Sequence, residues 1–107
     1  MATITVSYDG VELTLSDNGH TNASRSEQIH WHPGSGVHSV TNVVAKSNSP
    51  IPTAGFWSMV PQLNGVNFKG TISTVVGAWD YDITCNVGTQ QNPISKTKDP
   101  RIQVLSL

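Results

Sequence analysis

The stretch from Gly77 to Cys85 constrains the fold more than any other part of the chain, because apolar and polar side chains alternate along it. Successive side chains of a β-strand point to opposite faces, so a period of two separates them onto two sides. The apolar set is Trp79, Tyr81, Ile83 and Cys85, and the polar set is Asp80, Asp82 and Thr84. We expect a strand in the middle of the domain, with one face in a core and the other facing water.

The same alternation recurs along the chain, separated by turn residues. It predicts strands at 1–8, 11–15, 28–32, 37–46, 67–76, 77–85 and 101–107. Within 37–46 the alternation slips between Val40 and Val43, as it would at a β-bulge. Seven or eight short strands with this spacing are typical of a Greek-key β-sandwich, so we predict a single all-β domain over residues 1–107. Its predicted core contains Trp31, Trp79, Tyr81, Ile83, Ile102 and Val104.

Three segments do not alternate. Residues 16–26 and 88–98 are rich in small polar residues, and we expect both to be loops. Phe56, Trp57 and Met59 lie among prolines, and Pro61 is expected to limit any regular element there to about one turn. These three apolar side chains predict either a plug that closes one end of the sandwich or an exposed patch for recognition.

Composition excludes several classes of function. Only 12% of the 107 residues are charged and the formal net charge is -1, so there is no basic surface for nucleic acid. No apolar run approaches the ~18 residues of a membrane span, and no signal peptide is recognisable, so we expect a soluble chain. A single cysteine cannot form an internal disulfide. We predict no enzyme, because no serine has a nucleophile-elbow context, and the Asp80 and Asp82 pair is typical of a solvated outer face.

Three features in order resemble the cupredoxins, the blue-copper β-sandwich family. Ile29 to His32, a glycine-rich turn and then Gly36 to Val40 resemble the strand and turn that lead to a copper-ligand histidine, here His38. Gly77 to Cys85 is similar to the family's strand that ends in the copper thiolate, here Cys85, and Asp99 to Leu107 resembles the final strand. The resemblance implies a cupredoxin-like sandwich with the Cα atoms of His38 and Cys85 within about 10 Å.

The chain departs from that family at the metal site. A type 1 copper site takes two imidazoles, a thiolate and a weak axial ligand. In the family the second histidine and the axial methionine follow the cysteine, but residues 86–93 contain neither, and no histidine follows His38. We therefore predict a cupredoxin-like domain without blue copper and without a bound cofactor.

Two other metal arrangements stay open. His30 and His32 would project from the same face of a strand at a spacing that can chelate copper or zinc, together with the nearby His38. Cys85 is either a thiolate that joins His38 or a small buried apolar residue at the end of a core strand. The alternative to metal binding is an exposed polar face that uses histidine.

The function predicted from the sequence is a small non-catalytic binding or structural module that acts through a protein partner or a homo-oligomer interface. The candidate interface residues are Phe56, Trp57 and Met59. The alternative function is a copper- or zinc-binding protein that uses His30, His32 and His38, with or without Cys85.

Overall fold

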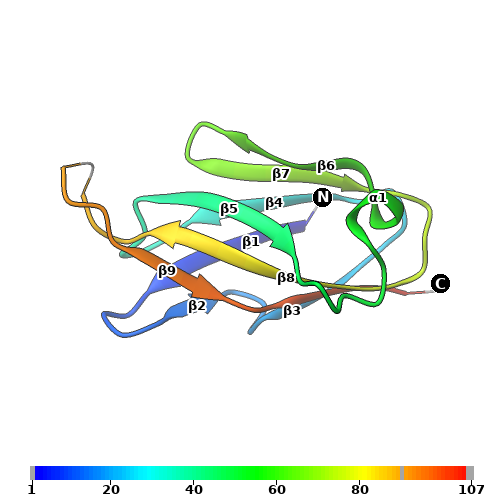
Figure 1. Cartoon of the computed structure of the whole chain (residues 1–107), viewed down its shortest axis with the longest axis horizontal. Coiled ribbons are helices and arrows are strands. Elements are labelled where there is room, and N and C mark those ends of the chain that lie inside the picture. The colour runs from blue at the N-terminus through cyan, green and yellow to red at the C-terminus, as the bar shows by residue number, and fades with distance from the viewer. Residues whose placement is uncertain (1, 90, 106–107) are drawn as a thin grey trace.

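Short alternating segments fold into ten strands and one helical turn in the computed structural model, which describes residues 2–89 and 91–105 (Figure 1). The elements are β1 (Ala2–Tyr8), β2 (Leu13–Leu15), β3 (His20–Ala23), β4 (Gln28–Pro33), β5 (Ser39–Ala45), α1 (Thr53–Phe56), β6 (Trp57–Asn64), β7 (Asn67–Ile72), β8 (Gly77–Asn86), β9 (Ser95–Lys98) and β10 (Arg101–Val104). The predicted all-β sandwich is confirmed, with more strands than the seven or eight expected. The ends of the predicted strands at Met1 and at 106–107 lie outside the described residues.

One sheet has the strand order β2-β1-β4-β7-β6. β1 and β2 form an antiparallel hairpin around the Asp9-Gly10 turn, whereas β1 and β4 are parallel. β6 and β7 form a second hairpin through the Asn64-Gly65 turn. Figure 1 shows this hairpin along the upper side of the molecule, with β6 as the last strand of its sheet.

The other sheet has the order β3-β10-β8-β5, and β9 also pairs with β8. β8 is the longest strand, with ten residues. It pairs along one side with β10 and then β9, and along the other side with β5. The predicted bulge is present as a register shift between Val40 and Asn42. The stretch 77–85 is therefore the central strand of its sheet, as its alternation predicts.

The core lies between the two sheets, and its buried apolar residues come from strands of both sheets. All six predicted core residues belong to one buried cluster: Trp31, Trp79, Tyr81, Ile83, Ile102 and Val104. Aromatic rings fill its middle. Trp79 stacks on Tyr81 with ring centroids 5.0 Å apart, and the Trp31 indole N–H donates to the Tyr81 hydroxyl at 3.0 Å.

Two strands occur where loops were predicted. β3 lies within 16–26, and its parallel pairing with β10 buries Thr21 and Ala23. β9 lies within 88–98 and has no buried residue, so it is held by its ladder with β8. Both predictions fail because such short polar strands have a weak apolar pattern, and for β3 the partner strand is also far away in sequence.

The expected limit at Pro61 is also wrong, because β6 continues through Pro61 to Asn64. An edge strand tolerates proline, since one side of its backbone needs no ladder hydrogen bond. The register with β7 also shifts twice, between Trp57 and Met59 and between Met59 and Gln62. Such bulges accommodate a residue that cannot donate to the ladder.

Among the residues that the structure describes, no helix has the length and apolar character needed to cross a membrane.

Candidate functional site

The His30 and His32 side chains project from the outer face of β4, as the sequence predicts. Ile29 and Trp31, which alternate with the histidines along the strand, are buried. His30 is half-buried and His32 is exposed. The two imidazole centroids lie 6.4 Å apart. The His30 Nε2 atom lies 3.1 Å from the Asn67 side-chain nitrogen, and burial, followed by the charges of Lys69 and His32, lowers the His30 pKa. This lowering favours the neutral form of the His30 imidazole.

His38 and Cys85 are neighbours along the ladder between β5 and β8. Val40 lies opposite Cys85, and the His38 backbone N–H donates to the Asn86 carbonyl at 2.8 Å. Positions offset by two residues across an antiparallel pair lie roughly 7–8 Å apart, so this register places the two backbone positions near each other. The side chains differ in their surroundings: His38 is exposed, whereas Cys85 is completely buried and burial raises its thiol pKa to about 12.

The predicted metal ligands are not gathered into one cluster. Within residues 2–89 and 91–105, no three histidine, cysteine, aspartate or glutamate side chains come together in an arrangement that could hold a metal ion. His30 and His32 form a ring pair on the outer face of β4.

The candidate interface of Phe56, Trp57 and Met59 needs a correction. Phe56 and Trp57 are 0% and 4% exposed, so their side chains form the predicted plug and do not line a surface. The turn of α1 and the start of β6 place both rings against Trp79, with centroid separations of 5.7 and 5.0 Å. Gly70 makes room for this packing, since a Cβ there would lie 2.9 Å from the Trp57 ring. Only Met59, at 62% exposed, is a surface residue.

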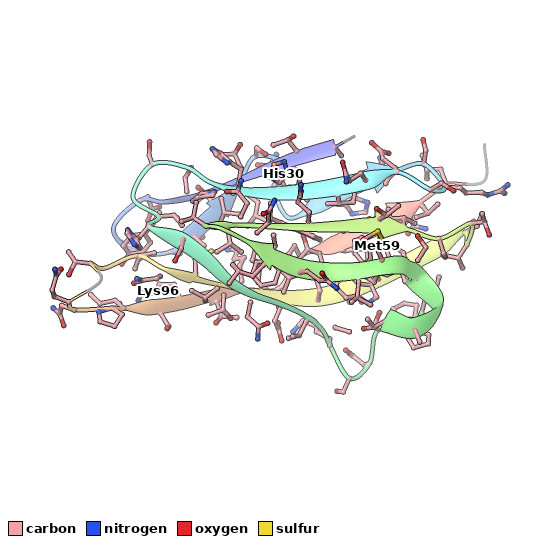
Figure 2. The ribbon with its side chains drawn as sticks, turned by 90° about the horizontal axis from the view of Figure 1, so that it is seen from above. His30, Met59 and Lys96 are labelled. Carbon is pink, nitrogen blue, oxygen red and sulfur yellow. The ribbon has the colours of Figure 1, made fainter. Side chains whose placement is uncertain are left out.

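Met59 belongs to a groove that the sequence analysis did not predict. The groove has a volume of about 350 Å³ and runs over β6 and β7. Its aliphatic side comes from β6, where Met59 and Leu63 are both more than half exposed and Val60 is 42% exposed. Figure 2 shows Met59 on this hairpin and His30 on the strand next to it in the sheet.

The polar side of the groove carries one charge. Gln28, Gln62, Asn64 and Thr71 line it together with the half-buried Lys69, and no carboxylate is among its described lining residues. Lys69 lies directly opposite His30 in the register of β7 and β4. A usable sequence signal for this surface would have been the unpatterned apolar residues around Pro61, which fit the exposed, bulged edge strand better than a plug.

Asp80 and Asp82 lie on the outer face of β8, where each pairs with a cation. Two side-chain nitrogens of Arg101 contact the two Asp80 carboxylate oxygens at 2.6 and 3.0 Å, and Lys46 contacts Asp82 at 2.9 Å. The hydrogen bonds from Arg101 lower the Asp80 pKa. These aspartates connect neighbouring segments across the sheet surface, and the lowered pKa of Asp80 is the opposite of what a catalytic acid needs.

The sequence matches no protein-family model, and a search of curated proteins found no significant match either.

Proposed function

We propose that this chain is a small non-catalytic binding or structural module that acts through a protein or oligomer interface at the groove over β6 and β7. The observation that carries the proposal is the exposed aliphatic surface of Met59, Val60 and Leu63 on an edge strand beside that groove. Contiguous exposed apolar residues rimmed by polar ones are typical of interaction sites.

Two assays test this proposal. Sedimentation velocity over a range of concentrations measures self-association, and selection from a displayed library of random peptides measures binding to another chain. We expect a complex in at least one assay, and we expect Leu63→Ser to weaken it. The matched control is Val11→Ser, because Val11 is 75% exposed and lies in the turn between β1 and β2, at the opposite edge of the sheet. If neither assay detects a complex, or if both variants behave alike, the proposal fails.

The module is further proposed to be cupredoxin-like without blue copper. The ladder between β5 and β8 supports this, because it brings the backbone positions of His38 and Cys85 together near the end of β8, as the resemblance implies. Addition of Cu(II) to the reduced protein is expected to give no intense blue thiolate-to-copper band. Appearance of that band would show that a type 1 site assembles and would refute this part of the proposal.

A second candidate function is copper or zinc binding by His30 and His32. It is favoured by the 6.4 Å separation of their rings on one sheet face and by the lowered pKa that favours neutral His30, the form that binds metals. A calorimetric titration with Zn²⁺ or Cu²⁺ measures the affinity. Binding that is lost in His32→Ala but kept in His20→Ala would support this site. Binding unchanged in His32→Ala would exclude it.

A further inference from the structure

Lys69 is a half-buried cation that lacks a counter-charge. Three cations elsewhere on the molecule have one: Lys46 pairs with Asp82, Lys98 with Glu12, and Arg101 with Asp80. Arg25 and Lys96, like Lys69, form no ion pair among the described residues, but neither of them lines the groove. The residue opposite Lys69 across the sheet is His30, whose lowered pKa favours the neutral form. A partly buried ammonium gains stability from an adjacent carboxylate, because the lower effective dielectric strengthens their attraction.

The groove beside Lys69 determines what else an occupant needs. Met59 and Leu63 offer aliphatic contact area, and β6 contributes no charged side chain. Amides from Gln28, Gln62 and Asn64 can donate to or accept from a peptide backbone. The surface therefore suits a ligand that combines aliphatic groups with a single negative charge.

The shape of the edge strand disfavours strand addition. β6 has two register shifts and contains Pro61, and both features interrupt the regular row of backbone donors and acceptors that an added strand would need. Recognition here has to come mainly from side chains. A second copy of this chain would present the same groove, which contains a lysine and no carboxylate, so a symmetric dimer would leave both Lys69 charges unpaired.

We propose that the groove over β6 and β7 receives an extended segment of a partner protein in which an aspartate or glutamate is flanked by aliphatic residues. The carboxylate pairs with the Lys69 ammonium, and the aliphatic side chains pack on Met59 and Leu63. This inference rests on the proposed function, because it specifies the partner of the same groove.

The experiment uses the peptides that the full-length protein selects from the random library. We expect the selected sequences to be enriched in Asp or Glu beside Leu, Ile or Val. Their affinity should fall about tenfold in Lys69→Met, the change that corresponds to loss of one charge-assisted hydrogen bond. Lys69→Arg should bind nearly as tightly as the parent. Lys96→Met is the matched control, since Figure 2 shows Lys96 towards the opposite end of the molecule from Met59.

The outcomes separate this inference from the proposed function. Peptides that depend on Leu63 but have no acidic residue, or that bind Lys69→Met as well as the parent, would overturn the acidic partner and leave the interface in place. Self-association through the groove without peptide selection would also overturn it. Absence of any complex would remove both the inference and the proposed function.

Discussion

Replacement of Tyr81 by phenylalanine tests the one buried hydrogen bond between side chains of the aromatic core. Trp31 and Tyr81 are both 0% exposed, and the indole N–H donates to the phenol oxygen at 3.0 Å. Phenylalanine keeps the ring stacked on Trp79 and in edge contact with Trp31, so only the hydroxyl is lost. The Trp31 N–H would then be buried without an acceptor, which costs about 1–3 kcal/mol. Removal of the buried hydroxyl offsets part of that cost, so we expect the free energy of unfolding to fall by about 1–2 kcal/mol.

This loss is measurable, because it is a substantial part of the free energy of unfolding, which is roughly 5–16 kcal/mol for a domain of this size. Urea unfolding followed by tryptophan fluorescence should show a lower midpoint with an unchanged slope, and the melting temperature should fall by about 4–9 °C. Tyr8→Phe is the control, since Tyr8 is only half-buried and should change stability by less than about 0.5 kcal/mol. A Tyr81→Phe variant that matches this control would refute a stabilising role for the hydrogen bond.

Four further predictions concern the core, the sheet surface and the thiol. Trp79→Ala should lower the free energy of unfolding by about 3–5 kcal/mol, because it empties the middle of the ring cluster, and urea unfolding followed by circular dichroism should show a much lower midpoint. Gly70→Ala should cost about 1–3 kcal/mol in urea unfolding, because the new methyl group meets the Trp57 ring at 2.9 Å. The His30 pKa is lowered in the folded state, so at a pH below the ordinary histidine pKa of about 6.5 the unfolded state binds more protons than the folded state does. Stability should therefore be full above that pH and decrease as the pH falls through the folded-state pKa, and His30→Gln should flatten this part of the profile. Cys85 should resist a thiol reagent at neutral pH until the protein unfolds, since it is buried and protonated, and rapid modification of the native protein would contradict its burial.

The interior could be predicted from the sequence because local alternation decides which side chains point inward. Trp79, Tyr81 and Ile83 follow a strict period of two, and all three are completely buried. The same pattern correctly predicts that Ile29 and Trp31 are buried while His30 and His32 project from the other face. Period-two burial needs no knowledge of the partner strand, and therefore a single sequence is sufficient.

The edge strands could not be predicted in this way, because their structure depends on which sides of the strand are paired and not on an apolar period. β3 forms by parallel pairing with β10, about eighty residues later in the chain. β6 continues past Pro61 because only one of its sides is paired, and this exposes Met59 and Leu63 while Phe56 and Trp57 turn inward. The groove thus arises from sheet order, and its one local signal is the set of unpatterned apolar residues around Pro61.

His38 and Cys85 show why a motif can predict a backbone neighbourhood without predicting a site. The ladder between β5 and β8 fixes how close the two positions lie, and this supports the proposed cupredoxin-like fold. Side-chain chemistry depends instead on burial, which leaves His38 exposed and keeps Cys85 as a protonated thiol. Since the thiolate is the form that binds a metal, any metal would first have to offset the cost of ionising a buried group. The proposed groove ligand would meet no comparable cost, because Met59 and Leu63 are already exposed in the folded chain and no buried group has to ionise.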